Sequence, residues 1–205
     1  NWFLKFLQFI CLGLGSMVFV PRTMSTQHPD NASAPFFASN SVLEGEAEVQ
    51  EAYFAFSNLG CTEQMWDFEG KEGDGFVVKK LLTRFETFFR QKKLGKDLRL
   101  TLRVPNPSVE KAEAKILLET LGSIPRSYDA ANIFYKEDIA PVFEVILPMT
   151  SSAAEVNNIY FYYKDFVVGK QSKQIFENGI KISVWIGKFK PETINVIPLI
   201  ETKDN

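Results

Sequence analysis

The sequence predicts an α/β protein with a mostly parallel sheet, and two observations support that fold class. Short apolar runs bounded by turn residues alternate with longer stretches of helical periodicity, which is the pattern of βα units. Polar side chains follow the ends of the apolar runs, where α/β barrels build their active sites. About four strands can be recognised, whereas a complete barrel takes about 250 residues. We therefore predict half of a TIM-type (β/α)8 barrel.

The composition is that of a globular protein with a sizeable core. Of the 205 residues, 45% are hydrophobic and 23% are charged. The 23 Lys and Arg residues nearly balance the 25 Asp and Glu residues, so no strong field favours nucleic acid or an anionic membrane as a partner. Two cysteines are too few for a disulfide framework and indicate a reducing compartment. The single histidine, His28, leaves a structural zinc site of His and Cys short of ligands.

The first twenty residues form a nearly continuous apolar stretch. Residues 2–20 match the ~20 residues of a membrane-spanning helix. They also resemble the core of a signal peptide, although no cleavage motif follows. Alternatively, the stretch is extraneous sequence ahead of a true start at Met17, or a buried core helix. We treat residues 1–16 as an extraneous or leader-like segment and residues 17–205 as the barrel portion.

Four apolar runs are expected to be strands, because each is short and bounded by turn residues. The clear candidates are residues 98–104, 142–147 and 194–200, and the weaker first strand is residues 17–20.

Four stretches of helical periodicity separate the strands, at residues 41–59, 76–94, 108–121 and 152–168. Ser41 and Glu44 form a capping box at the start of the first, and glycines follow the first and the second. Ser108 is expected to cap the third. The aromatic run YFYY leaves the fourth open to a strand assignment.

Three polar segments are expected to be loops. Residues 26–28 follow the first predicted strand. Residues 63–74 combine acids, Lys71 and glycines, as is typical of a solvated loop. Residues 123–129 are led by a proline and carry Arg126, which either binds an anion or lies on the surface.

Three residues stand where strands end and could carry chemistry. His28 is either solvated beside a turn or a polar group at the mouth of a barrel. Arg103 has a planar fork that suits carboxylate or phosphate, and the alternative is an ion pair that closes the barrel end. Glu201 suits a hard cation such as Mg²⁺ or belongs to a surface turn. The sequence contains no Walker loop, G-x-G-x-x-G or G-x-S-x-G, so nucleotide binding and serine hydrolysis have no support.

Seven segments, taken in order, resemble the archaeal-type phosphoenolpyruvate carboxylases. They are PRTMSTQHPDN (21–31), LGCTEQMWDFEGKE (59–72), FVVKKLL (76–82), LTLRVPNPS (100–108), ETLGSIPRSYD (119–129), VFEVILPMTSS (142–152) and VIPLIET (196–202). The resemblance covers nearly the whole chain from about residue 20. The family's chains are considerably longer, so the resemblance implies an N-terminal fragment, the N-terminal part of a TIM-type (β/α)8 barrel with extra helices.

The resemblance implies a cytoplasmic carboxy-lyase on an α/β barrel. Such an enzyme adds bicarbonate-derived CO₂ to phosphoenolpyruvate, through carboxyphosphate and a metal-stabilised enolate, and yields oxaloacetate and phosphate. This anaplerotic carbon fixation feeds the tricarboxylic acid cycle. The implied cofactor is Mg²⁺ or Mn²⁺, and the implied full-length assembly is a homotetramer that binds neither nucleic acid nor membrane.

The resemblance also implies roles for individual residues. His28 is similar to the histidine of the family's T-x-H-P motif, which stabilises carboxyphosphate. Arg103 resembles the strand-end arginine that binds substrate anions, and Arg126 and Lys71 are further candidates for substrate binding. Glu201 resembles a metal-binding glutamate whose companion aspartate should lie beyond residue 205. The fragment alone is therefore expected to be inactive.

Two segments depart from the family's pattern, the KEGD loop at Gly73 and the aromatic stretch YFYYKDF.

A second hypothesis also stays open: a membrane-anchored anion-binding protein without catalytic activity, in which residues 2–20 form a real helix.

Overall fold

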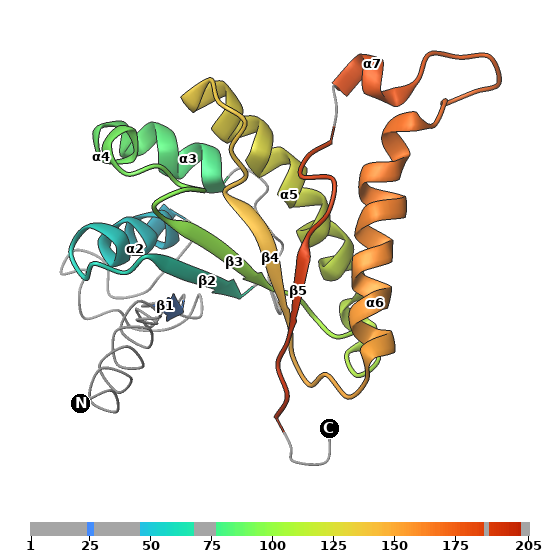
Figure 1. Cartoon of the computed structure of the whole chain (residues 1–205), viewed down its shortest axis with the longest axis horizontal. Coiled ribbons are helices and arrows are strands. Elements are labelled where there is room, and N and C mark those ends of the chain that lie inside the picture. The colour runs from blue at the N-terminus through green and yellow to red at the C-terminus, as the bar shows by residue number, and fades with distance from the viewer. Residues whose placement is uncertain (1–23, 27–45, 68–76, 187–188, 202–205) are drawn as a thin grey trace, which may run out of the picture.

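The computed structural model describes residues 24–26, 46–67, 77–186 and 189–201, and it has an α/β architecture (Figure 1). Five strands form one sheet in the order β1-β2-β3-β4-β5, and all four neighbouring pairs are parallel. The predicted α/β class with a parallel sheet is therefore confirmed. The strands are β1 (Met24–Thr26), β2 (Glu63–Asp67), β3 (Arg99–Arg103), β4 (Val142–Leu147) and β5 (Asn195–Pro198).

Three predicted strands are confirmed with small changes at their ends. β4 has the predicted bounds, β3 is one residue shorter at each end, and β5 is confined to the middle of the predicted run. The predicted first strand, residues 17–20, lies outside the described residues. β1 begins later along the chain, and its last residue is Thr26, which pairs with Met65 instead of lying in the predicted loop.

The loop prediction for residues 63–74 is wrong over its first five residues, which form β2 between β1 and β3. Glu63, Gln64 and Trp66 are all buried. The indole N–H of Trp66 donates a hydrogen bond to Gln64 Oε1 at 2.8 Å, and the Thr101 hydroxyl donates to the Glu63 carboxylate. Polar groups that have such partners can be buried at moderate cost, so the charged composition does not prevent strand formation.

The described helices lie around the sheet (Figure 1). The α-helices are α2 (Glu46–Ser57), α3 (Val77–Arg84), α4 (Glu86–Gln91), α5 (Ala114–Tyr135), α6 (Ala153–Tyr162) and α7 (Ile182–Ile186); the shorter turns are η1 (Lys111–Glu113), η2 (Tyr163–Val168) and η3 (Gly169–Ser172). α2 confirms the first predicted helix, whereas its predicted capping box, Ser41 and Glu44, lies outside the described residues. Gly60 follows α2 with φ +67°, a left-handed conformation that favours glycine.

The helix predicted at residues 76–94 is interrupted, because Phe85 leaves helical geometry at φ −119° and ψ 42° and separates α3 from α4. The Phe85 ring stacks on Tyr53 of α2 with a centroid separation of 3.8 Å. Phe88 contacts the same ring edge-on at 5.3 Å. Aromatic pairs of this kind contribute about 0.5–1.5 kcal/mol beyond their buried area, which offsets part of the cost of the break.

The helix predicted at residues 108–121 is wrong at both ends. α5 begins at Ala114 after η1, and it continues through Pro125 to Tyr135. The predicted loop at 123–129 is therefore helical. Buried residues at intervals of three and four explain why the helix continues past the proline: Leu117, Leu121, Ile124, Tyr128, Ala131 and Tyr135. Such a stripe packs on the core, and this packing compensates for the backbone bond that Pro125 cannot make.

The helix predicted at residues 152–168 is confirmed, including its aromatic run. The Ser152 hydroxyl caps α6 by accepting a hydrogen bond from the backbone N–H of Glu155 at 3.4 Å. The helix continues as the π-helical turn η2. The YFYY run is therefore helical rather than a strand.

The two faces of the sheet differ in character. Leu100 and Leu102 of β3, and Val104 directly after it, belong to one apolar cluster with residues of the surrounding helices, such as Leu121 of α5 and Ile159 of α6. Alternate residues of a strand point to opposite faces, so Thr101 and Arg103 lie on the other face. Polar residues are thus directed away from the helical layer.

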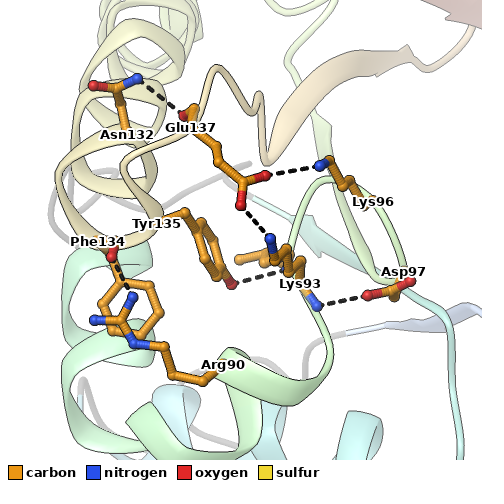
Figure 2. A network of polar contacts seen from close by, with 9 residues as sticks. Arg90, Lys93, Lys96, Asp97, Asn132, Phe134, Tyr135 and Glu137 are labelled. Carbon is orange, nitrogen blue, oxygen red and sulfur yellow. Dashed lines mark hydrogen bonds and ion pairs between the residues drawn. The ribbon is translucent and has the colours of Figure 1, made fainter.

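A polar network ties the loops at the amino edge of the sheet, where the chain enters β3 and β4 (Figure 2). The Glu137 carboxylate accepts from the ammonium groups of Lys93 and of Lys96, the latter at 2.8 Å. The Asn132 amide donates to the Glu137 carbonyl at 2.9 Å. The two lysine contacts fix the loop after α5 against the loop after α4, and the Asn132 contact fixes the loop after α5 to the end of its own helix.

Candidate active site

The carboxyl ends of all five strands lie along one edge of the sheet, because every neighbouring pair is parallel. The register aligns Asp67 at the end of β2 with Arg103 at the end of β3, and Arg103 with Ile146 of β4. α6 begins on the same side of the molecule, which is the lower part of the view in Figure 1. The predicted clustering of strand ends is therefore present.

Two buried carboxylates lie on the same face of the sheet as Arg103, Glu144 one step below the edge and Glu63 two steps below it. The register pairs Thr101 with Met65 and with Glu144, and Glu63 is two residues before Met65, so all four share a face. The side chains of Glu63 and Glu144 are buried, at 1% and 8% exposure. Sequence reasoning missed both acids, although Glu144 carried a signal: a glutamate inside an apolar strand must be paired when it is buried.

Asn106 joins the loop after β3 to the loop after β4, and it was also missed. Its side chain is fully buried, and its amide nitrogen donates hydrogen bonds to the carbonyls of Pro148 at 3.0 Å and Met149 at 3.3 Å. The same nitrogen lies 3.1 Å from Glu155 Oε2. The available signal was an asparagine between two prolines directly after a strand.

Glu155 sits in the first turn of α6 and completes this loop junction. It accepts hydrogen bonds from the Ser151 hydroxyl at 2.5 Å and from the Ser151 backbone N–H at 3.1 Å. These donors and the Asn106 amide lower the pKa of Glu155 to about 2. The carboxylate is therefore ionised at neutral pH and occupies the positive end of α6.

A groove of about 360 Å³ lies between the loop after β4, the start of α6 and the end of β5. Its lining residues include Thr150, Ser151 and Ile200, and the exposed Glu201 follows directly in the sequence. The Thr150 N–H donates to the Leu199 carbonyl at 3.1 Å. This bond brings the polar loop after β4 beside the chain that leads to Glu201.

The five predicted site residues are not all at this edge. Arg103 is partly buried at the end of β3, and Glu201 is exposed three residues after β5. His28 and Lys71 lie outside the described residues, although His28 follows the end of β1 by two positions. Arg126 lies in the middle of α5, ~18 Å along the helix from its first residue, and lines a separate groove of about 300 Å³ with Lys79 of α3.

A complete set of metal ligands is not present among the described residues. Within residues 24–26, 46–67, 77–186 and 189–201, no three His, Cys, Asp or Glu side chains come together in a way that could hold an ion. Mg²⁺ prefers near-octahedral oxygen ligands and gives up its waters reluctantly. Glu201 alone is therefore an incomplete site.

Comparison with known proteins identifies the family. A family model described as phosphoenolpyruvate carboxylase matches residues 20–205. The chain is 62% identical over 185 residues to a phosphoenolpyruvate carboxylase of Methanospirillum hungatei, 65% over 182 residues to that of Methanothermobacter thermautotrophicus, and 64% over 184 residues to that of Pyrococcus furiosus. These matches cover 89–90% of this chain but only 38–39% of the relatives. The chain thus spans about two fifths of their length.

The second hypothesis, a membrane-anchored binding protein, gains no support from these matches. In the parts of the chain that the structure describes, every helix is too short or too polar to cross a membrane. The family model matches residues 20–205, which is far more than half of the sequence. The chain therefore belongs to the phosphoenolpyruvate carboxylase family.

Proposed function

We propose that the complete protein is a phosphoenolpyruvate carboxylase, and that these residues supply part of its active site. The proposal rests on one observation in a member of this family: Arg103, the Thr150 loop and the approach to Glu201 lie along a single edge of the parallel sheet. Both substrates of the reaction are anions, so a partly buried guanidinium at that edge is suited to bind and orient them.

The sheet is proposed to be the first part of a (β/α)8 barrel. Sequential parallel strands with helices between them, as seen for β2 to β5, support this architecture. The polar face that carries Thr101 and Arg103 would then line the barrel interior. The separate segment at residues 1–16 is proposed to be dispensable.

In the proposed reaction, an oxygen of bicarbonate bonds to the phosphorus of phosphoenolpyruvate as the bond between phosphorus and the enol oxygen breaks. This step yields carboxyphosphate and the enolate of pyruvate. Carboxyphosphate then releases CO₂ and phosphate, and the methylene carbon of the enolate bonds to CO₂ to give oxaloacetate. Arg103 would hold the transferred phosphoryl group, and His28 would stabilise carboxyphosphate.

Further assignments belong to the same proposal. Lys71 and Arg126 are candidates for substrate binding, although Arg126 lies on α5 away from the strand ends. Glu201 is a candidate ligand for Mg²⁺ or Mn²⁺, with other ligands from outside the described residues. The relatives' shared name supports phosphoenolpyruvate and bicarbonate as the substrates, and a cytoplasmic homotetramer is the proposed assembly.

A hybrid enzyme tests the function directly. In this hybrid, residues 20–205 of the chain replace the matching segment of the Methanothermobacter thermautotrophicus carboxylase, with which they share 65% identity. We expect the hybrid to form oxaloacetate from phosphoenolpyruvate and bicarbonate, whereas the 205-residue chain alone forms none. The unaltered relative is the positive control, and the Arg103→Gln hybrid should lose most activity. A folded hybrid without activity would contradict the proposal.

A further inference from the structure

We propose that Asn106 is a positioning residue that holds the loops after β3 and β4 in one fixed relation at the carboxyl edge of the sheet. The inference rests on the proposed function, because it assigns a catalytic consequence to that relation. Asn106 follows Arg103 by three residues, and its amide reaches the loop that carries Thr150. It would therefore set the distance between these two parts of the site.

Both polar atoms of the Asn106 side chain make hydrogen bonds. Besides the three acceptors of its amide nitrogen, its Oδ1 accepts a hydrogen bond from the backbone N–H of Ser108 at 3.0 Å. Its backbone N–H donates to Glu110 Oε2 at 2.9 Å. A fully buried asparagine with every polar group engaged is held in a single orientation. Both loops are thus fixed to one rigid group.

The loop that Asn106 holds contains a backbone conformation that needs support. Met149 has φ 50°, in the left-handed region that costs a residue other than glycine free energy. The Asn106 amide donates to the Met149 carbonyl and to the Pro148 carbonyl that precedes it. The turn at Met149 is therefore stabilised by a residue from the neighbouring loop, more than 40 positions earlier.

Glu155 extends the junction to the first turn of α6. Its Oε2 accepts from Asn106 and from the Ser151 backbone, and its Oε1 accepts from the Ser151 hydroxyl. Loss of the Asn106 amide would leave two carbonyls and a carboxylate without this donor. All three acceptors belong to the loop after β4 and the first turn of α6, so the bonds that join them to the loop after β3 would be lost and the two loops should separate as water reaches the unpaired groups.

The opposite edge of the sheet offers a matched control. Asn132 also donates its amide to a backbone carbonyl, that of Glu137, at 2.9 Å. It lies at the amino edge, in the network of Figure 2. Asn132→Asp therefore removes a comparable hydrogen bond at a place where no reaction is proposed. Asn132 is half-buried and has one acceptor, so its loss should destabilise the fold less than loss of Asn106, and the activities are therefore compared per folded molecule.

The test compares Asn106→Asp, Asn106→Ala and Asn132→Asp in the hybrid enzyme, at a temperature well below every unfolding midpoint. We expect both Asn106 variants to lower kcat/KM by about tenfold or more, and Asn132→Asp to change it by less than about twofold. The double variant Asn106→Asp/Glu155→Gln should recover part of the loss, because the amide introduced at position 155 can donate to the carboxylate introduced at position 106. Equal losses in the Asn106 and Asn132 variants, per folded molecule, would overturn the proposal.

Amide hydrogen exchange of the hybrid enzyme keeps the inference separate from the proposed function, because exchange is measured without reference to turnover. Asn106→Asp should accelerate exchange in residues 106–110 and 149–155 and leave the amino-edge loops unchanged. An inactive unmodified hybrid would contradict the function, and unchanged exchange in both carboxyl-edge loops would overturn the role of Asn106 whatever the activity.

Discussion

The phenolic oxygen of Tyr135 accepts a hydrogen bond from the backbone N–H of Leu94 at 3.0 Å, at the amino edge of the sheet. Leu94 is fully buried, so its N–H has no access to water when this partner is removed. We expect Tyr135→Phe to lower the free energy of unfolding by about 1–3 kcal/mol, measured by urea denaturation. Tyr160→Phe is the control, because within the described residues the Tyr160 hydroxyl makes no hydrogen bond; equal losses in both variants would contradict the assignment.

Glu137 should make the protein's stability depend on pH in the acid range. The hydrogen bonds from Lys93 and Lys96 lower the pKa of Glu137 to about 2 from a usual 4.5. A lowered pKa in the folded state gives stability that is present above pH 4.5 and lost as the pH falls towards 2. We expect Glu137→Gln to be less stable than wild type at pH 7 and to converge with it near pH 2. Midpoints of thermal unfolding measured across this range test the expectation, with the exposed Glu177→Gln as a control that should follow wild type.

Arg90 should not be replaceable by lysine without loss of stability. Its guanidinium carbon lies 3.8 Å from the centroid of the Phe134 ring, and its nitrogens contact the Phe134 carbonyl and the Glu86 carboxylate. A lysine ammonium cannot stack and reach both acceptors together. We expect Arg90→Lys to cost about 0.5–1 kcal/mol, the range of an exposed cation–π contact, in urea denaturation. A double-mutant cycle with Phe134→Leu should show that most of the loss depends on the ring, and zero coupling would exclude this explanation.

His28→Asn should affect turnover more than substrate binding in the hybrid enzyme. The proposed role of His28 concerns carboxyphosphate, an intermediate that forms after phosphoenolpyruvate is bound. We expect kcat to fall by about 100-fold or more, whereas KM for phosphoenolpyruvate stays within about threefold. Steady-state kinetics of oxaloacetate formation measure both constants. A variant with near-normal kcat would show that the histidine has another role.

Glu201→Gln should weaken metal activation of the hybrid enzyme. An amide keeps the shape of the carboxylate but removes the charge that attracts a hard cation. We expect the Mg²⁺ concentration for half-maximal velocity to rise about tenfold or more, with Glu192→Gln, exposed in the segment before β5, unchanged. Titration of chelator-treated enzyme with Mg²⁺ measures this concentration. An unchanged Mg²⁺ requirement in Glu201→Gln would remove Glu201 from the set of ligands.

Sequence patterns predict the strands and helices where hydrophobic periodicity and local turn chemistry agree. β4 has its predicted bounds because six apolar-rich residues lie between clear turn signals. β2 could not be predicted in this way, because Glu63 and Gln64 are buried with partners that only the folded sheet brings together. Similarly, Pro125 indicates a loop locally, whereas the helix through it is stabilised by tertiary packing.

The sequence predicts a site residue only where the position of that residue along the chain already indicates its place in the fold. Arg103 and Glu201 stand at the ends of apolar runs, so their location at strand ends follows from the sequence. Asn106 and Glu155 contact each other only because the loop after β3 and the first turn of α6 come together in the fold. Their spacing along the chain does not predict that contact. The neighbouring Pro125 predicts a loop around Arg126, which lies on a helix instead.

Because the strand order follows the chain, each strand of the sheet finds its partner in the unit made just before it. A ribosome could therefore release βα units that dock one after another, with short delays between synthesis and pairing. The paired residues are 36 to 51 positions apart along the chain, so each step closes a long loop, but no strand has to wait for a partner that is made more than one unit later. During such growth the newest strand would stay exposed until the next unit covers it, and β5, whose residues are partly or fully exposed, is the last strand of the described sheet.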